Sequence, residues 1–88
     1  MSVGLAVTKI GQYSGLIDST TEQINVLQQQ IEAATLGGAQ PPADLRAQLA
    51  RKNVVLGLYK EFIDFWKQVL KDFLALIKSI GELAQGAR

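Results

Sequence analysis

The sequence predicts an all-α fold: an antiparallel two-helix hairpin with a coiled-coil-like seam, which assembles into a helical filament or a higher oligomer. Apolar residues recur at intervals of three and four in both halves of the chain, and Leu, Ala, Gln, Lys and Glu dominate the composition. The only two prolines stand together near the middle. We expect one domain over residues 1–88, with helices at about 3–36 and 43–85 and a turn at 37–42.

The first helix is expected to carry a single narrow apolar stripe. Its a and d positions keep a seven-residue repeat without interruption, while the flanking positions are mostly polar, so this stripe suits one principal neighbour. The a positions are Val3, Ile10, Ile17, Ile24 and Ile31, and the d positions are Ala6, Tyr13, Thr20, Leu27 and Ala34.

Three glycines interrupt the back of the same helix. Gly4, Gly11 and Gly15 fall on one line, and each costs about 0.5–1 kcal/mol relative to alanine inside a helix. Two interpretations remain open. Either the first fifteen residues are frayed or locally non-helical, or the glycines form a smooth groove in which another helix approaches closely.

The segment LGGAQPP separates the two helices. Gly37 and Gly38 suit a helix C-terminus, whereas Pro41 and Pro42 keep the preceding residues out of a helix and allow the next one to begin. Because the connection is short, we expect the second helix to fold back antiparallel to the first.

The second helix should present a matching seam to the first. If facing residues have numbers that add up to 79 or 80, every seam position finds a partner; Tyr13, for example, lies opposite Trp66. Lys52 interrupts the apolar run, and we expect its stem to pack while its ammonium group reaches water. Beyond Ile77 the second helix outruns the first. The seam residues are Leu45, Leu49, Lys52, Leu56, Tyr59, Ile63, Trp66, Leu70, Phe73 and Ile77.

A second apolar face on this helix has no partner within the hairpin. The residues directly before the a positions are usually charged in a coiled coil, but here they are apolar. They are Val55, Phe62, Val69, Leu76 and Leu83. Such a patch is too large for a soluble monomer, so we expect a homo-oligomer of many copies. Self-contact of the patch would give a dimer or a four-helix bundle, and contact with the glycine line of a neighbour would give a filament. The expected assembly residues are Leu58, Phe62, Phe65, Val69, Leu76 and Leu83, facing Gly4, Gly11 and Gly15.

The composition argues against several classes of function. A net charge of +1 offers no field for nucleic acid, and a chain without cysteine or histidine lacks a thiol nucleophile, an imidazole base and the usual zinc ligands. We therefore expect no enzyme activity, no catalytic or metal-binding residues and no cofactor. Charges recur throughout the apolar second half, so no transmembrane span is expected, and Lys9 interrupts what would be the apolar core of a secretory signal peptide.

The layout of the whole chain, and most closely PPADLRAQLARKNVVLGLYKEF at residues 41–62, resembles the needle and inner-rod subunits of bacterial type III secretion systems. Those proteins are signal-less helical hairpins with a proline-containing turn and a hydrophobic C-terminal helix that packs around a secretion channel. The resemblance implies a structural subunit of a secreted or cell-surface filament, with other secretion-apparatus proteins as partners.

Two other interpretations remain open. The chain could be a small cytoplasmic adaptor or chaperone whose second apolar face binds a partner helix in a dimer or four-helix bundle. It could also be a peripheral protein that lays Phe62, Phe65 and their neighbours on a membrane surface, although the small positive charge gives this little support.

Overall fold

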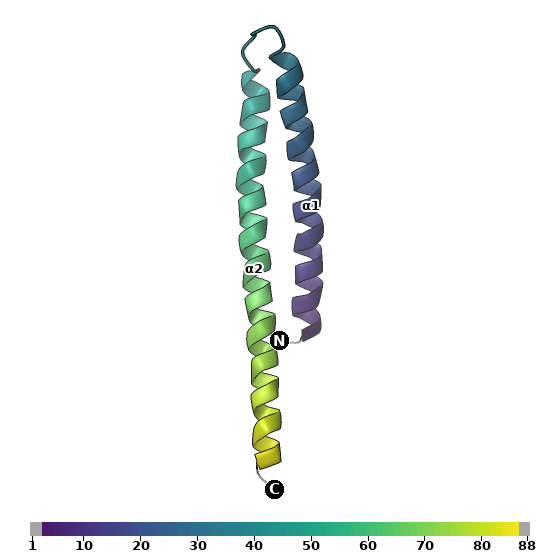
Figure 1. Cartoon of the computed structure of the whole chain (residues 1–88), viewed down its shortest axis with the longest axis vertical. Helices are drawn as coiled ribbons and strands as arrows, with labels where there is room; N and C mark the ends of the chain where they lie inside the picture. The colour runs from purple at the N-terminus through teal and green to yellow at the C-terminus, as the bar shows by residue number, and fades with distance from the viewer. Residues whose placement is uncertain (1–2, 87–88) are drawn as a thin grey trace.

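The protein is a hairpin of two long helices in a computed structural model that describes residues 3–86. Helix α1 spans Val3–Ala34 and helix α2 spans Ala43–Gly86. They lie side by side and antiparallel (Figure 1), within an envelope of 77 × 17 × 14 Å. The all-α, coiled-coil-like hairpin expected from the sequence is confirmed. Helix α1 ends two residues before the expected boundary, and α2 continues one residue past it.

Helix α1 ends through hydrogen bonds around Thr35. The Thr35 amide donates to the carbonyl oxygens of Ile31 (3.0 Å) and Glu32 (3.2 Å), and the Thr35 hydroxyl donates to the Glu32 carbonyl (3.0 Å). Gly37 and Gly38 follow with φ angles of 83° and 90°. An L side chain costs about 1 kcal/mol or more in this left-handed region, so the two glycines allow the chain to leave the helix and turn back.

Helix α2 begins directly after the proline pair. The Pro42 carbonyl accepts a hydrogen bond from the Arg46 amide (3.2 Å), which makes Pro42 the first acceptor of the helix. Asp44 places a negative charge in the first turn, where the exposed amides and the helix dipole favour it. The start of α2 at Ala43 agrees with the sequence prediction.

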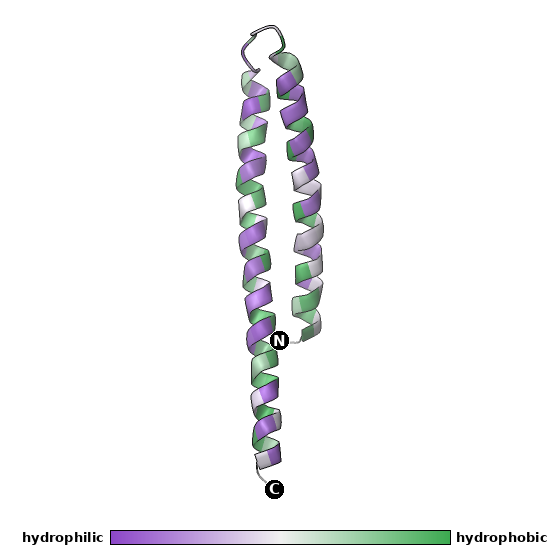
Figure 2. Ribbon diagram, viewed as in Figure 1, coloured by the Kyte–Doolittle hydropathy of each residue, from purple (hydrophilic) through white to green (hydrophobic). Residues whose placement is uncertain are grey.

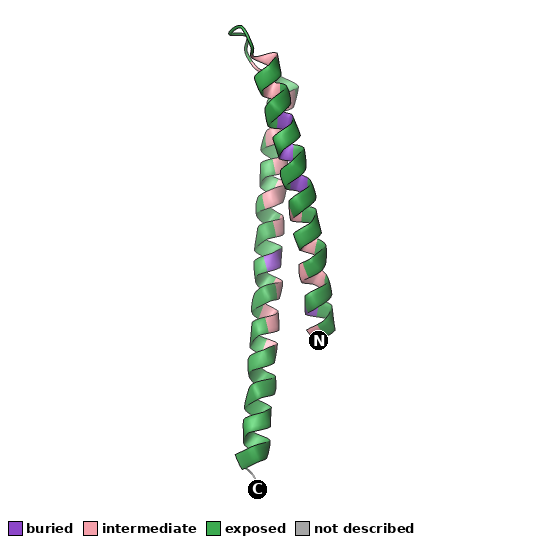
Figure 3. Cartoon of the chain, turned by 45° about the vertical axis from the view of Figure 1, so that its right-hand side comes forward, coloured by how far each residue is buried: buried purple, intermediate pink, exposed green. Residues whose placement is uncertain are grey.

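Buried side chains form a single seam between the helices. In α1 the ten a and d residues are all buried or half-buried, and in α2 so are the nine seam residues from Leu45 to Phe73. Figure 3 shows the buried positions facing the partner helix, and Figure 2 shows apolar stripes along both helices. The most buried residues are Ala6, Thr20, Ile24, Leu27 and Ile63.

The register of this seam differs from the prediction. The Tyr13 ring lies 5.4 Å from the ring of Phe62 and 6.2 Å from that of Tyr59, whereas the sequence pattern paired Tyr13 with Trp66. Phe62 precedes Trp66 by four residues, so the observed register is shifted from the predicted one by about 6 Å along the helix. Because a and d columns alternate every half heptad, a slide of about one turn leaves the same residues in the seam. The pattern therefore fails to choose between the two registers.

Helix α2 extends well beyond the start of α1 (Figure 1). Phe73 is the last half-buried residue, and every described residue after it is exposed. We call residues 74–86 the free segment. Ile77, expected in the seam, is 48% exposed and lies in the free segment, which corrects its assignment. The changed register accounts for this, because it removes Ile77 from beneath the first turn of α1.

Candidate assembly surfaces

The first candidate surface, here named the aromatic face, lies on α2 at the edge of the seam. It consists of Leu58, Phe62, Phe65 and Val69, which are spaced by three and four residues and so share one side of the helix. Phe65 is 57% exposed, Leu58 and Phe62 are each nearly half exposed, and Val69 is half-buried. Val55, from the same sequence column, is also half-buried. The upstream part of the predicted second face is thus partly covered by α1.

Two ring contacts position the aromatic face. Phe62 packs against Tyr13 with the ring planes tilted by 43°, so it closes the seam on one side while leaving its other side in solvent. Phe65 meets Trp66 edge to face, with centroids 5.4 Å apart and an angle of 81°. The contact of Phe62 with α1 was missed from the sequence. The signal that could have predicted this contact was the apolar residue Phe62 at a position that flanks the seam and is usually charged.

The second candidate surface is the free segment. Its large apolar side chains are about half exposed or more, and Leu83 reaches 74%. Leu76 and Leu83 were expected to be interface residues. Ile77 was expected beneath α1, and Leu74 and Ile80 were not assigned to an interface. The exposed residues are Leu74, Leu76, Ile77, Ile80 and Leu83.

The glycine line on α1 is helical and open. Helix α1 begins at Val3 and continues through Gly4, Gly11 and Gly15 without a break, so the interpretation of a non-helical start does not hold for residues 3–15, and residues 1–2 lie outside the described part of the chain. All three glycines are exposed. A Cβ atom at Gly11 or Gly15 would meet nothing within 4 Å. The hairpin therefore does not bring its own aromatic face against the glycines, and any such contact needs another molecule.

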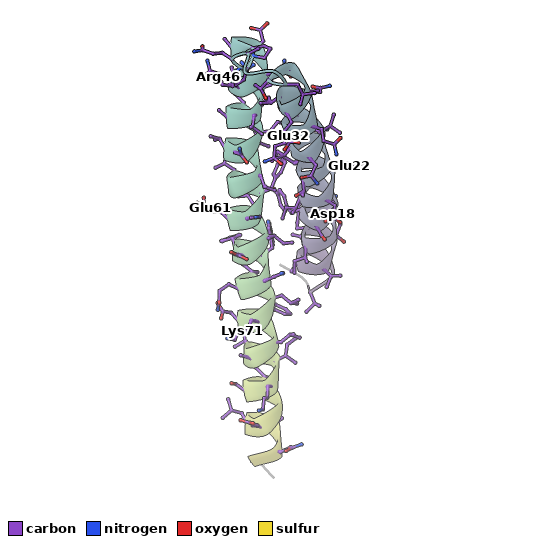
Figure 4. All side chains as sticks on the ribbon, turned by 45° about the horizontal axis from the view of Figure 1, so that its top comes forward. Asp18, Glu22, Glu32, Arg46, Glu61 and Lys71 are labelled. Carbon is purple, nitrogen blue, oxygen red and sulfur yellow. The ribbon has the colours of Figure 1, made fainter. Side chains whose placement is uncertain are left out.

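Several charged side chains lie on the surface of the hairpin. Asp18 and Glu22 on α1 and Arg46 and Glu61 on α2 are exposed and project from the hairpin (Figure 4). Within residues 3–86 no three Asp or Glu side chains gather where they could hold a metal ion. Over the same range, neither helix contains a stretch long and apolar enough to cross a membrane.

An open groove runs between the helices nearer the turn. The buried Leu27 and the half-buried Lys52 are among the residues that line it. It is open to solvent, whereas a small-molecule site is typically a concave and largely enclosed pocket. The lining residues are Ser19, Glu22, Gln23, Val26, Leu27, Gln30, Gln48 and Lys52.

Comparison of the chain with protein-family models, with curated proteins and with solved structures gave no match. The function is therefore inferred from the exposed apolar surfaces of the two helices. These surfaces differ in shape. The aromatic face presents bulky side chains, whereas the glycine line presents backbone without side chains.

Proposed function

We propose that this protein is a structural subunit that self-assembles in many copies, through the aromatic face of α2, into a helical filament or tube of a bacterial protein secretion apparatus. The observation that carries the proposal is the exposure of this face: Leu58, Phe62 and Phe65 are 45%, 44% and 57% exposed in the hairpin. Contiguous apolar side chains on that scale mark an interaction site in a soluble protein.

The small core of the hairpin supports assembly. Among the described residues only four apolar side chains are buried, and no large side chain is fully buried. Two helices that share one stripe bury little apolar surface per residue, and domains of this size are often only marginally stable alone. A neighbouring copy that covers the aromatic face would supply the missing burial.

The dissimilarity of two surfaces favours a filament over a closed dimer. Contact between the aromatic face of one copy and Gly11 and Gly15 of the next joins two different patches, and a contact of this kind propagates unless a rotation closes it into a ring. The open space at both glycines would let the Phe62 and Phe65 rings approach the backbone. The resemblance of the chain to type III needle and inner-rod subunits suggests the setting, a secretion apparatus.

Substituting Phe65→Asp tests the proposal directly. A charge in the middle of the aromatic face should abolish assembly, because a carboxylate would have to be desolvated in the contact, while the half-exposed position leaves the helices intact. Asn53→Asp is the matched control, since Asn53 is exposed on α2, gains the same charge and stands on another side of the helix from the aromatic face. Light scattering and negative-stain microscopy report assembly, and circular dichroism reports helix content.

The unmodified chain and the Asn53→Asp variant should form filaments that the Phe65→Asp variant lacks. Equal assembly of all three proteins would refute the role of the aromatic face. Uniform small particles in place of filaments would favour the adaptor or chaperone, and retention of the chain on vesicles in co-sedimentation would favour the peripheral membrane protein. Gly11→Leu tests the glycine line separately, since unchanged filaments in that variant would exclude it from the contact.

A further inference from the structure

The free segment continues the same seam that α1 covers upstream. Phe73, Ile77, Ile80 and Ala84 occupy successive d and a positions, in phase with Ile63, the most buried residue of α2. Phe73 is half-buried at the end of α1, whereas the three residues after it are exposed. An established helix interface thus runs on for nearly two heptads without its second helix.

The positions that flank this uncovered seam are free of charge. On one side stand Leu74 and Gly81, and on the other stand Leu76 and Leu83. Lys78 and Glu82, the only ionisable residues between 74 and 86, fall on the outer side of the helix. The flanking positions therefore add apolar surface and cause no repulsion against a helix of the same sequence.

Side-chain size changes along the free segment. Bulky Leu74, directly after Phe73, lies at the end next to α1, whereas Gly81 and Ala84 lie toward the other end. A Cβ atom at Gly81 would meet nothing within 4 Å, so its surroundings are empty in the single hairpin. A parallel pair of free segments would place large residues against large ones and small against small, which costs overpacking at one end and a void at the other.

An antiparallel pair removes this conflict. When Ile77 of one copy lies opposite Ile80 of the other, the same register places Phe73 opposite Ala84 and Leu74 opposite Gly81, so a large residue meets a small one in both of these pairs. The equivalent flanking pair on the second side is leucine against leucine. The facing pairs are Ile77 with Ile80, Phe73 with Ala84, Leu74 with Gly81, and Leu76 with Leu83.

We propose that the free segment of α2 binds the free segment of a second copy of this chain, antiparallel and two-fold symmetric. The contact is isologous, because each segment contributes the same residues to it. It is separate from the aromatic face, and it rests on the uncovered seam and the order of side-chain sizes. A membrane surface is the weaker occupant, since Lys78 and Glu82 cancel and leave the segment without the positive charge that attracts anionic lipid.

Disulfide trapping tests the orientation, because the chain has no cysteine of its own. Full-length Leu74→Cys and Gly81→Cys chains, both also carrying Phe65→Asp to suppress the filament contact, are mixed in equal amounts and oxidised mildly. The antiparallel pair places the two different cysteines side by side and separates identical ones by seven positions, or about 10 Å. The mixed disulfide should therefore exceed both identical-chain disulfides several-fold.

Val54→Cys mixed with Gly81→Cys is the control and should give no such preference, because Val54 lies far from the free segment. A statistical mixture of the three products from Leu74→Cys and Gly81→Cys, a predominance of identical-chain disulfides, or no disulfide at all would each overturn the proposal. A mixed disulfide without any filament in the unmodified protein would support the pairing and refute the proposed filament, so the two proposals can fail independently.

Gly81→Leu tests the size match in the Phe65→Asp background. Filling the space opposite Leu74 should raise the dimer dissociation constant about tenfold or more in sedimentation equilibrium. Gly57→Leu is the matched control, since a Cβ atom there also meets nothing and Gly57 lies outside the free segment. An equal rise of the dissociation constant in both variants would contradict the pairing. The pairing would also be contradicted if the protein were monomeric with and without Gly81→Leu and the substitution abolished its binding to vesicles.

Discussion

The covered and free parts of α2 have the same seam but different environments. Ile63, beneath α1, is 8% exposed, whereas Ile77, two heptads further along the same column, is 48% exposed. Nothing in the local sequence distinguishes these two isoleucines, since both stand at a positions with apolar neighbours. The difference teaches that a heptad pattern identifies the side of a helix that needs a partner. It leaves open whether the partner belongs to the same chain.

The largest predicted effect comes from truncating these two isoleucines in turn. Ile63→Ala should lower the free energy of unfolding by about 2–4 kcal/mol, because it leaves a void in the seam between the helices. Ile77→Ala should change the same quantity by less than about 0.5 kcal/mol in dilute monomer, since the side chain touches solvent there. Urea unfolding followed by circular dichroism, in the Phe65→Asp background, gives both values.

Similar losses for Ile63→Ala and Ile77→Ala would break the comparison. They would mean that α1 covers Ile77 in solution, as the register first expected from the sequence requires.

A smaller effect on stability is expected when a charged seam residue is replaced by an apolar one, or an apolar one by a charged one. Lys52→Leu should stabilise the hairpin by about 1 kcal/mol, because the half-buried position then holds an apolar side chain. The converse change in the free segment, Ile77→Lys, should leave monomer stability within about 0.5 kcal/mol. Thermal unfolding at low concentration measures both. If Ile77→Lys destabilised the dilute monomer, the free segment would already be packed within the hairpin.

The smallest effect is expected at two outward glycines. Gly57→Ala should raise the free energy of unfolding by about 0.5–1 kcal/mol, since nothing opposes the new methyl group and alanine is the better helix former. Gly81→Ala should add only a few tenths of a kcal/mol, because the uncovered end frays before the hairpin unfolds. Hydrogen exchange should show the same ranking, with the amides of residues 74–86 exchanging faster than those near Ile63. Equal protection in dilute monomer would contradict it.

Much of the fold could be predicted because it depends on local periodicity. The seam residues of both helices up to Phe73, the turn at Gly37 and Gly38, and the start of α2 follow from spacing and from glycine and proline chemistry. The register could not be predicted, because the pattern is satisfied again after each slide of half a heptad. The contact of Phe62 with Tyr13 and the full length of the free segment both depend on the register, so they were missed together.

The turn at residues 35–42 sets the length of α2 that extends past the start of α1. It fixes how far α1 reaches along α2, because the seam itself accepts more than one register, and so it fixes how much of α2 protrudes. A slide of one turn toward the other register would bring Ile77 back beneath α1 and shorten the protruding helix by about four residues. Insertions in this exposed loop cost little, so the reach of the subunit toward its neighbours can be reset there without altering any contact residue.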